Sequence, residues 1–184
     1  QPRGELGEIM HFESHFDRYR PEVRNRWREQ AIAGSGLWYD LGSHLLDQAV
    51  QLFGMPQAIG LDTAIQRAGG QADDWFHATL RYGQRRVILH GSALVARVGP
   101  RFIVHGQKGS VIKYGLDTQE DALKAGLRPP AADWGHDPEP MQLTCWTDGV
   151  PAQRDLACEP GNYPGYYAAV RDAVWGEGEN PVPA

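Results

Sequence analysis

Apolar and polar positions separate most clearly between residues 34 and 54, where the sequence reads GSGLWYDLGSHLLDQAVQLFG. At ~100° per residue, the apolar side chains fall on one broad helical face and a narrow polar stripe falls opposite. The apolar face comprises Leu41, Leu45, Leu46, Ala49, Val50, Leu52 and Phe53. The polar stripe comprises Asp40, His44, Asp47 and Gln51. A carboxylate near the start, Gly54 after the last turn and Pro56 just beyond it are typical helix start and stop signals.

Much of the remaining chain alternates as β-strands do. Residues 8–19 place Met and Phe side chains on one face and ionisable side chains on the other. The ionisable face comprises His11, Glu13, His15 and Asp17, beside Ile9. Further strands are expected at 58–67, 75–82, 86–97, 101–105, 110–114, 142–147 and 150–158, and helices at 119–125 and 163–175. Short turns between successive strands favour an antiparallel meander. We therefore expect an α+β fold with a large, mostly antiparallel, open-faced sheet and helices on one face.

Both faces of the predicted strand 86–97 are largely apolar, whereas a solvated antiparallel sheet has one polar face. This pattern predicts self-association as a homodimer through the sheet face that the helices leave uncovered. The alternative is that the loop of residues 129–140 folds over that face.

Composition narrows the class of function. A chain of 184 residues suffices for one domain with its own core. The net charge of −5 and a pI near 5.8 argue against nucleic acid as a partner. No apolar run is long enough to span a membrane. Cys145 and Cys158 form neither a metal motif nor a disulfide framework, so we expect a cytoplasmic location.

The polar stripe of the central helix has two interpretations. Asp40 can be a helix cap and His44 a solvated side chain, as expected of any polar helix face. Alternatively, the two form a proton-transfer site, because a carboxylate one turn before a histidine can orient the imidazole and stabilise its protonated form. No metal ligand is assigned, since His11 and His15 would lie ~13 Å apart along one strand face. The Gly-rich segments at 34–36 and 106–110 lack the surroundings of nucleotide-binding loops.

Four segments together resemble the C-terminal α/β domain of the Gfo/Idh/MocA oxidoreductases, a family named for glucose–fructose oxidoreductase, inositol dehydrogenase and a rhizopine-catabolism protein. The stretch from Gly36 to Asp47 is similar to the family motif G-G-x-x-x-D-x-G-x-H-x-x-D. The other three segments are RWRE at 26–29, HGQKGSV at 105–111 and KYGLDTQEDALKAG at 113–126. The resemblance covers nearly the whole chain, residues 1–184, as a single substrate and dimerisation domain.

The resemblance implies an NAD(P)-dependent dehydrogenase acting on a sugar, cyclitol or related polyol. An N-terminal Rossmann domain, absent from this sequence, would bind NAD or NADP, so this chain alone should bind no cofactor and be inactive. Asp40 and His44 match the family's catalytic positions, and Asp47 is a possible supporting residue behind them. Trp27 and Arg28 match a segment that reaches toward the cofactor, although a structural role is equally compatible.

Two other functions stay open. One is a non-catalytic module that dimerises through the sheet. The other is a metal-dependent lyase or isomerase that uses Asp40, His44 and Asp47 as ligands.

Overall fold

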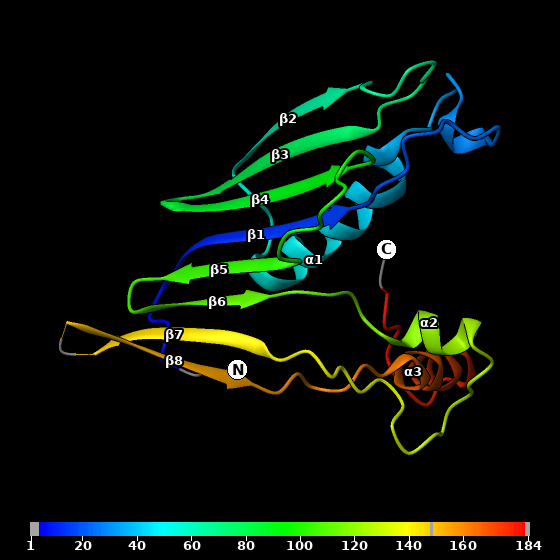
Figure 1. The fold of residues 1–184 in the computed structure, drawn as a ribbon. Helices are drawn as coiled ribbons and strands as arrows, with labels where there is room; N and C mark the ends of the chain where they lie inside the picture. Colours follow the sequence, from blue (N-terminus) through cyan, green and yellow to red (C-terminus); the bar gives the residue numbers. More distant parts are fainter. Residues whose placement is uncertain (1–3, 148, 183–184) are drawn as a thin grey trace. The chain divides into compact units, whose positions relative to one another are not determined.

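The computed structural model of the chain describes residues 4–147 and 149–182, and within them eight strands form one sheet (Figure 1). The strands are β1 (Ile9–Asp17), β2 (Ala58–Ala64), β3 (Trp75–Tyr82), β4 (Arg85–Ser92), β5 (Phe102–Gly106), β6 (Gly109–Lys113), β7 (Met141–Thr147) and β8 (Val150–Leu156). Their order across the sheet is β2-β3-β4-β1-β5-β6-β7-β8. The predicted α+β class with a large, mostly antiparallel sheet is confirmed.

The predicted simple meander is wrong at one place, because the first strand lies between β4 and β5. β1 runs parallel to β4 and antiparallel to β5. The chain leaves the sheet after Ser92, so the predicted strand 86–97 ends there, and the Ser92 carbonyl accepts the N–H of Arg18 at 2.9 Å. β4 and β5 therefore form no hairpin. Their edges pair with β1 instead.

The central helix is confirmed, with a different start. A π-helical turn, η2 (Trp38–Gly42), leads directly into α1 (Ser43–Phe53). The helix ends as predicted at Gly54, whose φ is 75° and whose N–H donates to the Val50 carbonyl at 2.8 Å. A positive φ of this kind favours glycine, which explains the stop.

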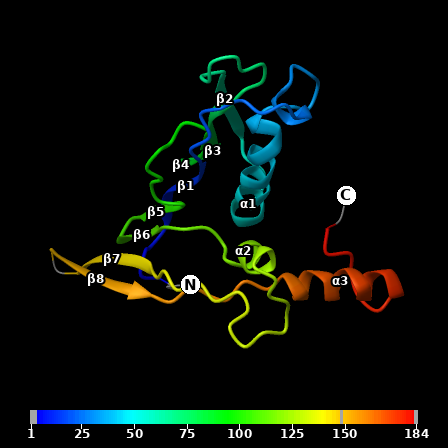
Figure 2. The ribbon, with the colours of Figure 1, turned by 45° about the vertical axis from the view of Figure 1, so that its right-hand side comes forward.

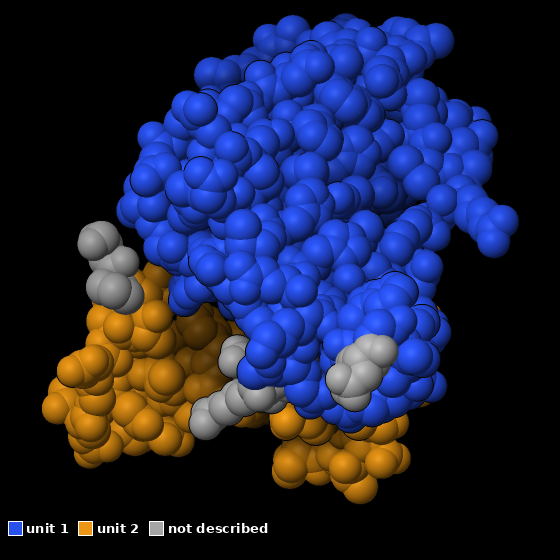
Figure 3. Space-filling view, turned by 90° about the vertical axis from the view of Figure 1, so that its left-hand side faces the viewer, with its two compact units in different colours: residues 1–114, 141–155 blue, residues 115–140, 156–184 orange. Residues whose placement is uncertain are grey.

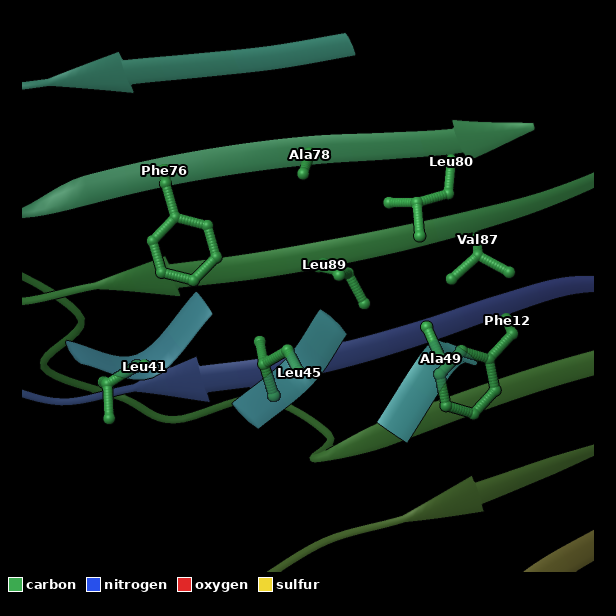
Figure 4. Close-up of a cluster of buried hydrophobic side chains, with 9 residues drawn as sticks. All are labelled: Phe12, Leu41, Leu45, Ala49, Phe76, Ala78, Leu80, Val87 and Leu89. Atoms are coloured by element: carbon green, nitrogen blue, oxygen red, sulfur yellow. The ribbon is translucent and has the colours of Figure 1, made fainter. Parts of the chain in front are cut away.

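α1 packs against one face of β1, β3 and β4 (Figures 1 and 2). The buried cluster at this contact is Phe12, Leu41, Leu45, Ala49, Phe76, Ala78, Leu80, Val87 and Leu89 (Figure 4). Leu45, Leu80 and Leu89 are completely inaccessible to solvent. The buried face of α1 is narrower than the predicted apolar face, since Leu52 belongs to the predicted face and is 55% exposed.

The chain forms two compact units, residues 1–114 with 141–155 and residues 115–140 with 156–184, which Figure 3 distinguishes by colour. The first unit contains the central helix and nearly all of the sheet. The second contains α2 (Gln119–Lys124) and α3 (Tyr163–Trp175). The assignment of 1–184 to one functional domain stays a prediction.

A buried amide organises the second unit. Gln119 is 2% exposed, and its Oε1 accepts both the Trp134 indole N–H at 2.9 Å and the Tyr163 backbone N–H at 2.7 Å. The side chain thus fixes the long loop to the start of α3. No residue of α3 is buried, although its sequence predicts an apolar side. None of the helices in the described residues is long and apolar enough to cross a membrane.

Candidate functional site

The start of η2 is fixed by a side chain from the segment before β3. The Asp73 carboxylate accepts the Trp38 N–H at 2.7 Å, and the Asp73 backbone carbonyl accepts the Leu37 N–H at 2.7 Å. Gly36 precedes this turn with a φ of +96°, and a Cβ there would lie 1.9 Å from Asp73 Oδ1. Asp73, rather than Asp40, therefore caps the helical segment, and Asp40 is left free for another role.

The π-helical turn itself has a packing reason. The indole of Trp38 lies so close to Gly42 that a Cβ at this glycine would be 2.2 Å from the ring. Trp38 also packs edge-on against Phe76 in the core, with ring centroids 5.2 Å apart. Turns of this kind widen the helix by one residue and are frequent at functional sites. Asp40 lies inside this widened turn.

Asp40 lies in a small pocket with a strongly basic lining. Its side chain is 24% exposed, and Oδ1 lies 3.3 Å from Arg28 Nη1. The lining also includes Arg18, Arg20, Arg26, Arg67, Glu29 and Asp73. The Arg28 guanidinium thus fixes one oxygen of the Asp40 carboxylate and leaves the other available to a neighbouring donor.

The basic side of this pocket is held by one buried ion-pair network. Glu29 is 8% exposed and accepts the Arg24 backbone N–H at 2.8 Å and Arg26 Nε at 2.7 Å. Arg67 lies 3.2 Å from Glu29 and donates through Nε to Asp74 at 2.9 Å. Burial raises the pKa of Glu29, but these donors outweigh it and hold the pKa below its ordinary value. The segment that precedes the pocket is therefore ordered by buried charges.

Trp27 and Arg28 lie together on the short 3₁₀ turn η1 (Trp27–Glu29). The Arg28 guanidinium is 5.3 Å from the centroid of the Trp27 ring. The two side chains are 49% (Arg28) and 54% (Trp27) exposed. Arg28 thus contacts both the Asp40 carboxylate and the exposed Trp27 ring.

His44 and Asp47 are both exposed on α1, on the side away from buried Leu45 and Ala49. No hydrogen bond or ion pair ties either side chain to the described part of the chain. The structure thus brings Asp40 together with Arg28, places His44 one helical turn later, and leaves Asp47 in solvent. Within residues 4–147 and 149–182, Asp40, His44 and Asp47 do not form a ligand set for a metal ion.

Sequence reasoning missed the residues that build this pocket. Asp73 and Asp74 stand directly before β3, and Arg67 follows β2, so all three read as turn or strand-end residues. Two adjacent carboxylates before a buried strand are the one local signal that could have marked them. Their partners lie more than thirty residues away along the chain, at Trp38 and Glu29.

A second group of ionisable side chains lies on the sheet face away from α1. Glu13 stands between two imidazoles, with Oε1 2.6 Å from His11 Nε2 and Oε2 2.7 Å from His15 Nε2. Burial raises the pKa of Glu13, but the two histidines lower it further, so that it lies below its ordinary value. The predicted common face of His11, Glu13 and His15 is therefore confirmed by direct contacts. On this side β4 carries Ile88, His90 and Ser92, as the alternation of the sequence predicts.

The family of the chain follows from its similarity to known proteins. The model of the oxidoreductase family's C-terminal alpha/beta domain, named for Gfo, Idh and MocA, matches residues 2–184. The chain belongs to the Gfo/Idh/MocA oxidoreductase family. The predicted resemblance is thereby confirmed.

Individual relatives agree with this assignment. The uncharacterized oxidoreductase YdgJ of Escherichia coli K12 is 58% identical over 181 residues, which cover 98% of this chain and 52% of YdgJ. The scyllo-inositol 2-dehydrogenase (NADP(+)) IolW of Bacillus subtilis 168 is 40% identical over 183 residues, or 98% of this chain and 51% of IolW. The solved structure of YPO2259 from Yersinia pestis has a TM-score of 0.92 at 55% identity, covering 98% of this chain and 51% of that one. The chain thus spans about half the length of the curated relatives that it matches.

Proposed function

We propose that this chain is the substrate-binding and proton-transfer domain of an NAD(P)-dependent oxidoreductase that acts on a cyclitol, sugar or related polyol. The observation that carries the proposal is the position of Asp40, in a π-helical turn inside a basic pocket, with exposed His44 on the following turn. Membership in the family supports the oxidoreductase class, and the similarity to a scyllo-inositol dehydrogenase supports the polyol class.

Two side chains divide the proposed chemistry. A substrate hydroxyl gives its proton to the His44 imidazole, which no other described side chain engages. A bound nicotinamide would accept the hydride from the carbon that carries this hydroxyl. Asp40 orients the proton acceptor and balances its developing positive charge. General acid–base assistance of this kind contributes ~10²–10⁴-fold in rate. The nicotinamide supplies the hydride chemistry.

A separate nucleotide-binding domain is part of the proposal. The chain spans about half of its relatives, and an N-terminal Rossmann domain would supply NAD or NADP. Exposed Trp27 and Arg28 are the proposed contacts to that cofactor, and Asp47 is a possible supporting residue behind His44. Cys145 and Cys158 form no disulfide with each other, which supports the proposed reducing, cytoplasmic location.

We also propose a homodimer formed through the sheet face away from α1. Support comes from the packing of α1 on one face only, which leaves Ile88, His77 and Trp75 partly exposed on the other. Ile88, half-buried on this face of β4 and paired with Glu13 of β1, is the natural probe of this surface. Sedimentation should show a dimer that Ile88→Lys dissociates without unfolding. A monomer at micromolar concentration contradicts this part of the proposal.

The functional proposal is tested with the full-length protein that carries this domain. Purified protein is mixed with NAD⁺ or NADP⁺ and with a panel of inositol isomers and aldoses, and formation of reduced nicotinamide is followed by absorbance. We expect turnover of at least one polyol. Reduction of neither cofactor by any compound of the panel would contradict the polyol assignment.

A further inference from the structure

The face of the sheet away from α1 carries a second candidate site, which neither the proposed reaction nor the sequence motif uses. We propose that His15, Asp17 and His90 bind a divalent transition-metal ion, with Zn²⁺ as the natural probe. These are the one group of three or more metal-ligating side chains in the described residues whose donor atoms come together, all within 4.8 Å of one another.

The strand register brings the three residues together. His15 of β1 and His90 of β4 are directly paired in the parallel ladder, and their ring centroids lie 5.5 Å apart. Asp17 lies two residues beyond His15 and therefore projects from the same face. Because two hydrogen-bonded strands fix these positions, the arrangement needs no loop to order it.

The distances suit metal coordination better than hydrogen bonding. Asp17 Oδ2 lies 3.7 Å from His15 Nδ1, and Oδ1 lies 3.5 Å from His90 Nε2. Hydrogen bonds between such groups are usually about 2.7–3.2 Å long. Ligand atoms around tetrahedral zinc, with bonds of about 2.0–2.2 Å, are about 3.3–3.6 Å apart. Small side-chain movements would therefore close the site around an ion.

Glu13 orients the His15 ring for metal binding. Its carboxylate lies 2.7 Å from His15 Nε2 and can accept an N–H from that nitrogen, which in the neutral ring leaves the lone pair on Nδ1, the atom on the Asp17 side. Metal-bound histidines usually donate their second ring N–H to a carboxylate or carbonyl in this way. Glu13 is thus a positioning residue, and it contacts no ion itself.

The Asp17 carboxylate has unused bonding capacity. The side chain is 8% exposed, and Oδ1 is buried without a hydrogen-bond donor among the described residues. Arg101 interacts with its charge, but donates its hydrogen bonds to Ser14 Oγ at 3.0 Å and to the His15 carbonyl. A buried carboxylate oxygen without a donor is costly, and a bound cation would satisfy it.

Solvent can reach the proposed ligands, and their donor atoms favour one class of metal ion. The side chains of His15 and His90 are 21% and 16% exposed, so an ion can enter from the sheet face. Two imidazoles and one carboxylate favour zinc-type ions over Mg²⁺ or Ca²⁺, which prefer oxygen ligands. Water would complete the tetrahedron.

The test is titration of tag-free, chelator-treated protein with ZnCl₂ near neutral pH, followed by calorimetry. We expect one zinc ion per chain. Glu13→Gln should weaken binding ~10–100-fold, and His90→Ala and Asp17→Asn should weaken it more. His105→Ala is the matched control, since this histidine lies on the same face in β5 but outside the ligand set, and it should leave the affinity unchanged.

Circular dichroism checks that each variant is folded. If His90→Ala does not fold, Asp17→Asn decides, and Co²⁺ loading of the unaltered protein provides an independent measurement. The intense visible absorption of tetrahedral Co²⁺ is expected. The proposal is overturned by the absence of stoichiometric zinc binding, by unchanged affinity in the ligand variants, or by the weak spectrum of six-coordinate Co²⁺. Because zinc binding is measured separately from turnover, its outcome is independent of the proposed reaction. The site lies on the face proposed for the dimer, so the titration is made on protein whose oligomeric state sedimentation has established.

Discussion

Removal of the Asp73 carboxylate tests how the site is built. In the unaltered protein the Trp38 N–H donates to the Asp73 carboxylate at 2.7 Å, and Asp73→Ala removes this acceptor. A hydrogen bond to a charged group is worth ~1.5–3 kcal/mol, and loss of a helix cap costs ~0.5–2 kcal/mol. The bond from the Leu37 N–H survives, because its acceptor is the Asp73 backbone carbonyl. We therefore expect a loss of ~1.5–2 kcal/mol in the free energy of unfolding, and a smaller loss for Asp73→Asn, which keeps an acceptor.

Gly36→Ala provides the coupled perturbation. Its Cβ would lie 1.9 Å from Asp73 Oδ1 at a φ of +96°, so both a clash and backbone strain arise. The backbone strain alone costs ~1–2 kcal/mol, and it persists whether residue 73 is aspartate or alanine. The clash disappears once Asp73 is alanine. The double variant should thus be more stable than the sum of the single changes by ~1 kcal/mol or more.

Urea unfolding followed by far-UV circular dichroism measures the free energy of unfolding of the unaltered protein and of the four variants. The reasoning is refuted if Asp73→Ala costs less than ~0.5 kcal/mol, or if the two changes are additive within ~0.5 kcal/mol.

Three further predictions concern two buried side chains and the binding of nicotinamide cofactors. Because the pKa of Glu29 is lower in the folded state than its ordinary 4.5, its contribution to the free energy of unfolding is full above that value and is lost as pH falls through the folded pKa. In urea unfolding, Glu29→Gln should therefore be less stable than the unaltered protein at neutral pH, by a difference that shrinks in acid. A difference that does not change with pH would contradict this. Leu45→Ala should cost ~2–5 kcal/mol, whereas Leu52→Ala, at a position 55% exposed, should change stability by less than ~1 kcal/mol, and equal effects would argue against the packing of α1. The chain of 184 residues should not bind NAD(H) or NADP(H) in calorimetry, and a micromolar dissociation constant would refute that expectation.

Much of the fold could be read from local patterns. β3 and the third helix, 163–175, have the predicted bounds, because alternation, helical periodicity and Gly or Pro punctuation are local properties. The stop of α1 at Gly54 follows from the same kind of signal. The insertion of β1 between β4 and β5 could not be read in this way, since strand pairing over seventy residues leaves no local mark.

The candidate site was predictable only in part. Asp40 and His44 stand out because they occur in a motif on one helix. The Asp73 cap, the buried pair of Glu29 and Arg67, and the approach of His15 to His90 each join distant segments. From the sequence, His11 and His15 are set aside as a shared metal site, because they lie four residues apart on one strand. The pairing of His15 across the sheet depends on register, which the sequence does not reveal.

The proposed proton transfer is tested by the turnover number of the full-length enzyme carrying Asp40→Asn or His44→Ala, with Asp47→Asn as the matched carboxylate on the same helix. We expect each of the first two changes to lower turnover by ~10²-fold or more. Asp47→Asn should lower it less than ~10-fold, because its side chain lies in solvent. Melting temperatures should change little, since His44 is exposed and Asp40 does not cap the helix. Unimpaired turnover in His44→Ala or Asp40→Asn, with a sharply lower melting temperature, would contradict the account.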